Sequence, residues 1–218
     1  MRGSVRGSRV ILFDFDGTLA DTAADLSRPL NKMRAARGME PLPIEQLRPH
    51  ASAGARGLIG AGLGIGPEHA DFKDLREEFL RHYRDEICVE TRLFPGMEAL
   101  LSGIEGRGLR WGIVTNKATN LTRRIVDELD LAKRAACVVC GDTTPHLKPH
   151  PASLLHASSE LGIAPAEGVY LGDDQRDIQA ARAAGMPCVA VGWGYGTDLH
   201  AWEADDVIAR PEDLLSRL

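Results

Sequence analysis

The sequence predicts an α/β protein, with a doubly wound parallel sheet and a small helical domain inserted after the first strand. Short apolar runs alternate with helical periodicity from residue 95 onwards, which is typical of a parallel sheet with helices on both faces. Before that point, one apolar run is followed by an almost purely helical stretch. A chain of 218 residues can hold both parts, so we expect an α/β core at 1–20 and 91–218 and the inserted domain at 21–90.

The first part of the chain contains one expected strand and two expected helices. Residues 10–13 are an apolar run that enters a polar, glycine-containing turn, as a buried parallel strand does. Helical periodicity follows at 20–38, where prolines end it, and again at 72–83. Between these helices, glycines crowd residues 51–66, which indicates either a close approach of the backbone or a mobile loop.

The remaining elements alternate between the two types. We expect strands at 109–114, 137–140, 169–171, 188–191 and 207–209, and helices at 97–104, 121–129, 153–161 and 178–184. Cys137 and Cys140 form a C-x-x-C pair inside one of these strands. Side chains three residues apart point to opposite faces of a strand, so we expect structural thiols rather than a metal or redox site.

Composition excludes several classes of protein. The formal net charge is -5, and the chain shows no basic footprint that would predict a nucleic-acid partner. No apolar run is long enough to cross a bilayer. We therefore expect a cytoplasmic protein that binds neither nucleic acid nor membrane, as a monomer or a homodimer.

Four of the expected strand ends carry polar residues, and open α/β sheets build their sites at this edge. After the first strand, Asp14 and Asp16 place two carboxylates close together, which is costly unless a cation neutralises them. Gly17 then allows a tight turn. An ordinary strand-ending turn would explain one aspartate and the glycine, but not the second aspartate.

The next two strand ends carry groups suited to an anion. Thr115 and Asn116 offer a hydroxyl beside backbone N–H groups, which can bind phosphate oxygens, although the pair is also an ordinary helix N-cap. Lys148, fixed by the proline after it, could offset charge on a phosphoryl group, although Lys-Pro is usually a surface turn. Neither signal is diagnostic by itself.

The last of these strand ends is acidic. Asp173 and Asp174, with Asp177 three residues later, supply the hard oxygen ligands that suit Mg²⁺. The alternative is a helix N-terminus with acidic residues in its first turn. Each of the four signals has such an alternative, but the ordered set does not.

This ordered set resembles the haloacid dehalogenase-like (HAD) hydrolases, in which D-x-D-G-T precedes a Ser or Thr, then a Lys, then a G-D…D cluster. Here the matching positions are 14–18, Thr115, Lys148 and 172–177. The resemblance covers nearly the whole chain, including the helical insertion after the first motif. It implies an α/β core with a cap domain, and a Mg²⁺-dependent phosphatase that forms an aspartyl-phosphate.

The resemblance also implies roles for the motif residues. Asp14 would be the nucleophile, and Asp16 the general acid that later activates water. Thr115 and the backbone of Asn116 would bind the phosphate, and Lys148 would neutralise the intermediate and orient the nucleophile.

The metal site is implied in the same way. Asp14, the backbone carbonyl of Asp16, and Asp173 would hold Mg²⁺. Asp177 would act behind these ligands or orient the lysine. Asp174 stands where many relatives carry Ser, so its direct contact with the metal is left open.

The small insertion resembles the cap of the phosphoglycolate phosphatase-like branch, whose substrates are small phosphate esters. Ser52, Gly54 and Arg56 form its candidate substrate loop, because a glycine-rich backbone with one Arg can grip an anionic group. The alternative is a helix start with an exposed Arg. From the core, Gly17 and Lys117 are further candidates for substrate binding, with Lys117 and Arg56 suited to a carboxylate.

Some segments resemble N-acetylmuramic acid 6-phosphate phosphatases of peptidoglycan recycling, among them 72–83, 111–117, 172–178 and 194–196. Phosphoglycolate and this amino-sugar phosphate both carry a carboxylate. The choice between them depends on cap volume and stays open.

Other functions on the same scaffold are weaker alternatives. Phosphonate cleavage typically needs a cap lysine for a Schiff base, and Lys32 and Lys73 are the only lysines of the insertion, neither in an evident apolar pocket motif. A sugar-phosphate mutase is not excluded. A non-catalytic binding module would be expected to lose one of the central motif residues, and none is lost.

Overall fold

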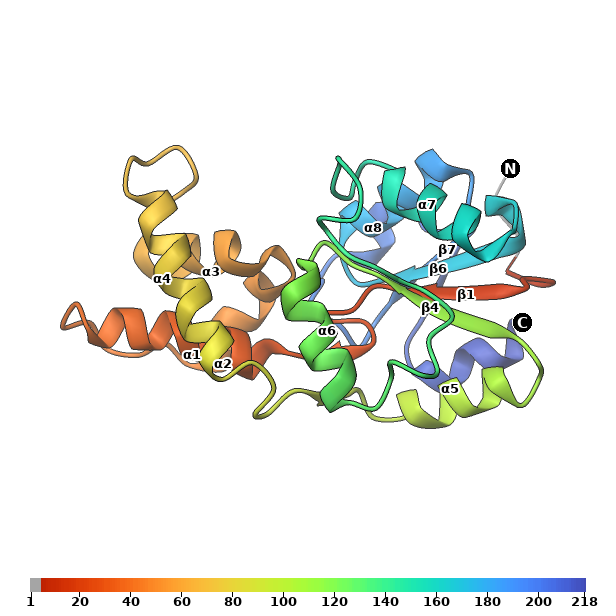
Figure 1. The fold of residues 1–218 in the computed structure, drawn as a ribbon, viewed down its shortest axis with the longest axis horizontal. Helices are drawn as coiled ribbons and strands as arrows, with labels where there is room; N and C mark the ends of the chain where they lie inside the picture. The colour runs from red at the N-terminus through yellow and green to blue at the C-terminus, as the bar shows by residue number, and fades with distance from the viewer. Residues whose placement is uncertain (1–4) are drawn as a thin grey trace.

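The computed structural model describes residues 5–218, so the first four residues of the expected core lie outside the described residues. Six parallel strands form the central sheet, in the order β5-β4-β1-β6-β7-β8 (Figure 1). Their bounds are β1 (Val10–Phe13), β4 (Arg110–Val114), β5 (Val138–Val139), β6 (Gly168–Gly172), β7 (Cys188–Val191) and β8 (Asp206–Ile208). The predicted α/β fold with a parallel sheet is confirmed.

Helices cover both faces of this sheet because strand side chains alternate between the faces. The core helices are α5 (Met97–Glu105), α6 (Thr119–Glu128), α7 (Ala152–Leu161) and α8 (Gln175–Ala184). In β1, Val10 and Leu12 pack into the cluster that contains α7 and α8, whereas Ile11 and Phe13 pack into the one that contains α5 and α6. In Figure 1, α7 and α8 lie above the sheet and α5 lies below it.

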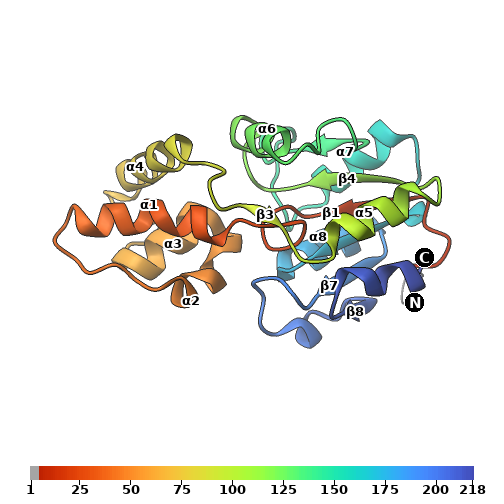
Figure 2. The same ribbon diagram turned by 90° about the horizontal axis from the view of Figure 1, so that it is seen from below.

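A helical insertion extends to the left of the sheet in Figure 1. Its helices are α1 (Ala23–Ala35), α2 (Ile44–Leu47), α3 (Gly54–Leu63) and α4 (Phe72–Asp85). Two short strands, β2 (Ala20–Asp21) and β3 (Arg92–Leu93), pair antiparallel where the chain leaves and re-enters the core (Figure 2). Each strand is two residues long, which is too short for sequence periodicity to reveal. Because β2 occupies the start of the helix predicted at 20–38, the observed helix α1 begins later, at Ala23. Across residues 5–218, no helix is both long and apolar enough to span a membrane.

Residues 51–63 of the glycine-rich segment are helical, and residues 64–66 follow them without regular structure. The helical residues form the end of a 3₁₀ helix (Arg48–Ala53) and then α3. Gly62 lies against Leu30 of α1 so closely that a Cβ at residue 62 would overlap the leucine side chain. The close-approach alternative therefore holds at this position, and the small residue lets α3 pack against α1.

Asp25 ties the two ends of the insertion together. The carboxylate is buried in the first turn of α1 and accepts hydrogen bonds from the backbone N–H of Glu90 at 3.0 Å and of Thr91 at 2.8 Å. The Thr91 hydroxyl and Arg28 also donate to it, each at 2.7 Å. Burial alone would raise the pKa of Asp25, but these hydrogen bonds lower it below its ordinary value.

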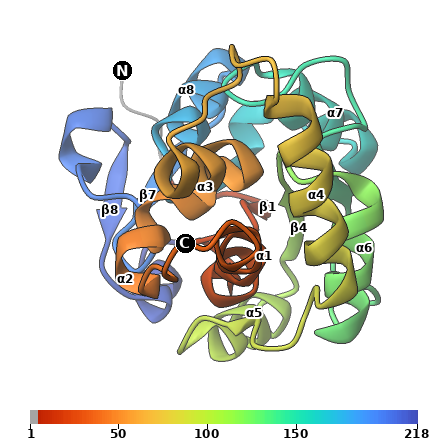
Figure 3. The ribbon, with the colours of Figure 1, turned by 90° about the vertical axis from the view of Figure 1, so that its left-hand side faces the viewer.

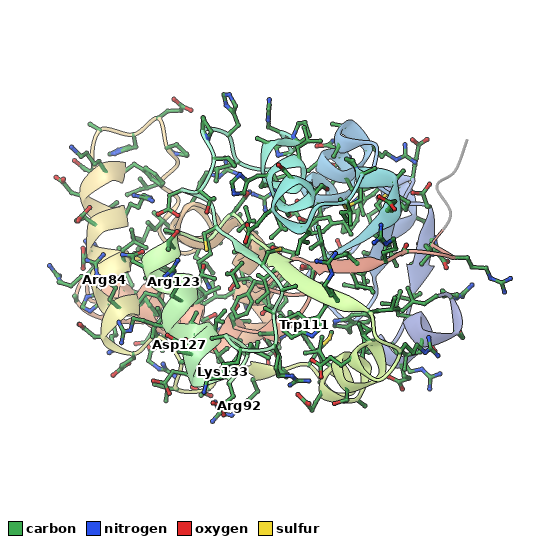
Figure 4. The ribbon with its side chains drawn as sticks, turned by 45° about the vertical axis from the view of Figure 1, so that its right-hand side comes forward. Arg84, Arg92, Trp111, Arg123, Asp127 and Lys133 are labelled. Atoms are coloured by element: carbon green, nitrogen blue, oxygen red, sulfur yellow. The ribbon has the colours of Figure 1, made fainter. Side chains whose placement is uncertain are left out.

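We expect Asp25→Asn to lower the free energy of unfolding by about 2–4 kcal/mol, because an amide NH₂ would face donors in a buried site. Asp127→Asn is the matched control, since Asp127 is exposed on α6 (Figure 4). Urea unfolding at neutral pH measures both. A loss no larger than that of the control would contradict the anchoring role.

The same pair of proteins gives a pH test. An aspartate whose pKa is lower in the folded protein than in the unfolded chain stabilises the folded protein while it is ionised. This stabilisation is complete above the ordinary Asp pKa of about 3.9, and it is lost as pH falls through the pKa of the folded state. The stability difference between wild type and Asp25→Asn should therefore be constant from neutral pH to about pH 5 and shrink below about pH 4.

Candidate active site

The carboxyl edge of the sheet brings the predicted residues together. Asp14 follows β1, Thr115 follows β4, Asp173 follows β6, and Lys148 lies in the loop between β5 and α7. β1 pairs with both β4 and β6, so these strand ends are neighbours. Figure 3 looks towards this edge, with the helices of the insertion in front of it.

Three buried carboxylates form the centre of the site. One oxygen each from Asp14, Asp173 and Asp177 lies within 4.8 Å of the others. Burial raises the pKa of Asp14 to about 7, with Lys148 opposing and Asp177 reinforcing the rise. Burial and the charges of Asp14 and Asp177 raise the pKa of Asp173 well above its ordinary value. Because ionisation of Asp14 and Asp173 is costly in this buried cluster, a bound cation would stabilise the carboxylates, and the three groups are chemically suited to hold a metal ion.

Lys148 is the cation that the chain itself supplies. Its Nζ lies 2.8 Å from Asp14 Oδ1 and 2.7 Å from Asp177 Oδ1, and the Tyr170 hydroxyl is 2.6 Å away. Burial alone would lower the pKa of Lys148, but the charges of Asp14 and Asp177 raise it, so the group stays an ammonium. With all three carboxylates ionised, one ammonium would leave two negative charges, which a divalent cation would balance.

Thr115 and Asn116 support this arrangement in different ways. Asn116 exchanges two hydrogen bonds with the backbone of Lys148, donating to its carbonyl at 3.0 Å and accepting from its N–H at 2.8 Å. The Thr115 hydroxyl accepts from the N–H of Lys117 at 3.1 Å, and its own hydrogen has no acceptor among residues 5–218. The Asn116 side chain thus fixes the Lys148 loop, while the Thr115 hydroxyl can donate to an incoming oxygen.

The carboxylates at the start of α8 have different partners. Asp173 accepts from the Thr18 hydroxyl at 2.8 Å and from the Tyr195 N–H at 3.0 Å. Asp174 is the N-cap of α8 and pairs with Arg176 at 2.7 Å, as the N-cap alternative anticipated. Asp177 accepts from the N–H of Asp174 as well as from the buried lysine. These contacts fix the three aspartates in different orientations.

Gly17 is required by its backbone conformation and by a close neighbour. Its φ is +88°, and a Cβ there would overlap the carboxylate of Asp173. Its N–H donates to the carbonyl of Ala20 at 3.0 Å. The N–H of Gly17 is thus used inside the turn, and the predicted role of Gly17 in substrate binding stays a prediction.

Lys117, which the sequence predicts to bind substrate, is engaged by two protein groups in this structure, and its role in substrate binding stays a prediction. Its Nζ lies 2.5 Å from Asp16 Oδ1 and 2.9 Å from the hydroxyl of Tyr83, which belongs to α4 of the insertion. Burial alone would lower the pKa of Lys117, but the charges of Asp16 and Tyr83 and the hydrogen bonds to them raise it. Sequence analysis missed Tyr83, because it fits the apolar face of an amphipathic helix.

The candidate substrate loop of the insertion reaches the core at one residue. The Ser52 hydroxyl donates to Asp173 at 3.0 Å, and Arg176 donates to the Ser52 carbonyl at 3.0 Å. Gly54 begins α3 with a φ of +56°. Arg56 lies in the first turn of α3 with an exposed side chain that pairs with no other residue in 5–218, which is the arrangement of the second alternative. Its role in substrate binding stays a prediction.

A second contact between insertion and core was not predicted. Arg48 of the insertion pairs with Asp21 at 2.9 Å and lies over the ring of Tyr195, 5.5 Å from its centroid. The Tyr195 hydroxyl donates to Asp21 at 3.0 Å and accepts from the N–H of Thr22 at 2.7 Å. No sequence pattern links these residues, because Tyr195 is more than 170 positions from Asp21 and Thr22, where the chain leaves the core.

Residues 11–191 match the family of haloacid dehalogenase-like hydrolases. The chain belongs to this family, in its phosphoglycolate phosphatase-like branch, and it is a HAD-type phosphatase.

Particular relatives span nearly the whole chain. A phosphoglycolate phosphatase of Xanthomonas campestris pv. campestris (strain 8004) is 41% identical, covering 96% of both chains. One from Xylella fastidiosa (strain Temecula1) is 44% identical, covering 96% of this chain and 92% of its own. An N-acetylmuramic acid 6-phosphate phosphatase of Pseudomonas aeruginosa is 39% identical, covering 96% and 94%.

The fold is similar to solved structures. The crystal structure of a predicted phosphoglycolate phosphatase from Haemophilus somnus 129PT has a TM-score of 0.84 at 24% identity, covering 96% of this chain and 97% of that one. A haloacid dehalogenase-like hydrolase from Streptococcus pneumoniae has a TM-score of 0.83 at 21% identity, covering 96% and 98%. At these identities the similarity supports the fold alone.

We expect Gly17→Ala to destabilise the protein more than Gly7→Ala. Both glycines have a left-handed φ, +88° and +85°, but only a Cβ at residue 17 meets another group. The conformational cost is about 1–2 kcal/mol in each variant, and the overlap with Asp173 should bring the Gly17→Ala loss to about 2–5 kcal/mol. Thermal and urea unfolding measure both, and equal losses would contradict the close contact with Asp173.

Proposed function

We propose that the protein is a Mg²⁺-dependent phosphatase that hydrolyses 2-phosphoglycolate through an aspartyl-phosphate on Asp14. The observation that supports this most directly is the buried cluster of Asp14, Asp173 and Asp177 around Lys148. The substrate is inferred from the phosphoglycolate phosphatases that match over nearly the whole chain. N-acetylmuramic acid 6-phosphate is the second candidate, because Pseudomonas relatives of that name match at 39% identity.

Asp14, Asp173 and the backbone carbonyl of Asp16 are the groups proposed to hold Mg²⁺. The two negative charges left by the cluster support this choice, as does the preference of Mg²⁺ for oxygen ligands. Bound there, the ion would neutralise the charge of the phosphate oxygens. Asp177 and Asp174 are proposed to act behind the ligands, Asp177 through Lys148 and Asp174 as the cap of α8.

In the first chemical step, Asp14 attacks phosphorus. Lys148 holds its Oδ1, and Oδ2 has no hydrogen-bond partner within residues 5–218, so Oδ2 is the proposed nucleophilic atom. As its bond to phosphorus forms, the bond to the ester oxygen breaks, and Asp16 gives that oxygen a proton. Thr115 donates its hydroxyl hydrogen to a phosphate oxygen, beside the backbone N–H of Asn116.

In the second step, water attacks the phosphorus of the aspartyl-phosphate. Asp16, now a carboxylate, takes a proton from this water, the bond between phosphorus and Asp14 breaks, and inorganic phosphate leaves. Lys148 stabilises the Asp14 carboxylate that is restored. The enzyme thereby returns to its starting state with atoms and charges balanced.

Residues 21–90 are proposed to be a cap over a core made of 1–20 and 91–218. The contacts of Ser52 with Asp173 and of Tyr83 with Lys117 support this, because they place the insertion over the carboxyl edge of the sheet. A cap in this position would exclude water from the phosphoryl group.

Two further observations bear on the alternatives. Lys32 pairs with Glu86 at 2.8 Å and Lys73 is exposed, so neither lysine of the insertion is placed for the Schiff base of phosphonate cleavage. The cysteines, at positions 88, 137, 140 and 188, are all free thiols, which supports the proposal of a cytoplasmic enzyme. A monomer or a homodimer is proposed for its oligomeric state.

The test is phosphate release from 2-phosphoglycolate, N-acetylmuramic acid 6-phosphate and simple sugar phosphates, with Mg²⁺ and with EDTA. We expect one ester to be preferred by at least about a hundredfold in kcat/KM, with activity lost in EDTA and restored by Mg²⁺. Asp14→Asn should lower kcat by about a thousandfold or more. A folded wild type that releases no phosphate, or moves it to another hydroxyl as a mutase would, contradicts the proposal.

We also propose that the loop with Ser52, Gly54 and Arg56 contributes to substrate binding. Arg56→Ala should then lower kcat/KM for 2-phosphoglycolate by about tenfold, through the lost carboxylate contact, and spare p-nitrophenyl phosphate. Arg76→Ala is the matched control, since Arg76 is an exposed residue of α4. Equal losses on both esters, or no loss on either, would contradict this role.

A further inference from the structure

Lys117 joins the core to the insertion through its charged end. Its Nζ donates to Asp16 Oδ1 at 2.5 Å and to the Tyr83 hydroxyl at 2.9 Å, and it lies 5.1 Å from the centroid of the Tyr83 ring. The side chain is only 7% exposed. Two of its three N–H donors are therefore used by protein groups, in a position shielded from water.

Asp16 is held by one oxygen only. Its Oδ1 accepts from Lys117 and also from the Thr22 hydroxyl, at 2.6 Å. Its Oδ2 has no hydrogen-bond partner in the described part of the chain. The two donors fix the rotation of the carboxyl group and leave Oδ2 as the oxygen that can exchange a proton with a substrate.

Tyr83 makes this arrangement depend on the position of the insertion. It lies near the end of α4, whereas Lys117 lies between β4 and α6 of the core. Helices α4 and α6 also meet at the Arg84 carbonyl, which accepts from Arg124 at 2.8 Å; Figure 4 labels Arg84 on α4 and Arg123 on α6. If α4 moved away, Lys117 would lose its contact with Tyr83 and become exposed to water.

We propose that Lys117 is a positioning residue that holds Asp16 for proton transfer, and that Tyr83 makes this position depend on the docking of α4 against the core. This inference rests on the proposed function, in which Asp16 protonates the leaving oxygen. It assigns no substrate contact to Lys117, which differs from the prediction made from the sequence.

Three esters separate this role from the alternatives. 2-Phosphoglycolate has an alkyl leaving group and a carboxylate, glycerol 2-phosphate has an alkyl leaving group without a carboxylate, and p-nitrophenyl phosphate has a leaving group that needs no proton. The ratio kcat/KM reports the step in which the leaving group departs. A defect in the placement of the acid therefore affects both alkyl esters and spares the nitrophenyl ester.

We expect Lys117→Met to lower kcat/KM for both alkyl esters by about a hundredfold, mainly through kcat, and for p-nitrophenyl phosphate by less than about fivefold. Tyr83→Phe, which keeps the ring and the lysine–aspartate pair, should give the same pattern at about tenfold. Thermal unfolding is measured alongside, and Tyr83→Phe carries the test if Lys117→Met fails to fold.

The matched control is Lys133→Met. Lys133 is an exposed lysine beyond the end of α6 and has no partner within residues 5–218 (Figure 4). It should change kcat/KM by less than about twofold for all three esters.

The other outcomes overturn the inference in distinguishable ways. A loss confined to 2-phosphoglycolate, with raised KM, would make Lys117 a ligand of the substrate carboxylate. Equal losses on all three esters would make its role structural. Asp16→Asn serves as the reference. If Asp16→Asn left kcat/KM for the alkyl esters unchanged, Asp16 would not be the acid, and the proposed mechanism itself would be wrong.

Discussion

The concentration of negative charge at the carboxyl edge of the sheet is the constraint on which the site depends. Parallel pairing of β1 with β6 puts Asp14 and Asp173 at adjacent strand ends, and α8 adds Asp177. Lys148 must then reach these groups from the loop beyond an outer strand, and Asn116 fixes that loop through two hydrogen bonds. Because one ammonium cannot balance three carboxylates, the fold is built to receive a further cation.

The insertion begins only a few residues after Asp14, so one short segment contains both the proposed catalytic carboxylates and the start of the insertion. Residues 14–22 contain the proposed nucleophile Asp14, the proposed acid Asp16, the turn at Gly17 and the strand β2, where the chain leaves the core. Thr22 shows this most directly, since its hydroxyl binds Asp16 while its N–H binds Tyr195 of the core. A shift of Thr22, where the insertion begins, would therefore move Asp16 directly, through the hydrogen bond between them.

The cations near the insertion differ in how far protein groups already occupy them. Lys117 is occupied by Asp16 and Tyr83, and Arg48 is occupied by Asp21 and the ring of Tyr195. Arg56 is exposed and pairs with no other residue in 5–218. Arg56 therefore remains the proposed contact for a substrate carboxylate, whereas the paired cations hold the insertion on the core.

The sequence by itself determined the α/β fold, the helical insertion and the acidic strand ends, because these are local patterns of periodicity and turn chemistry. The D-x-D-G-T run could be placed at a strand end without knowing any distant contact. Only the tertiary structure decided the partners of the long cationic side chains and of Tyr83 and Tyr195. Lys117 is the clearest example, because the docking of α4 gives it a tyrosine partner that no local pattern in the sequence predicts. Such side chains reach several positions, so their partners depend on how separate parts of the chain pack together.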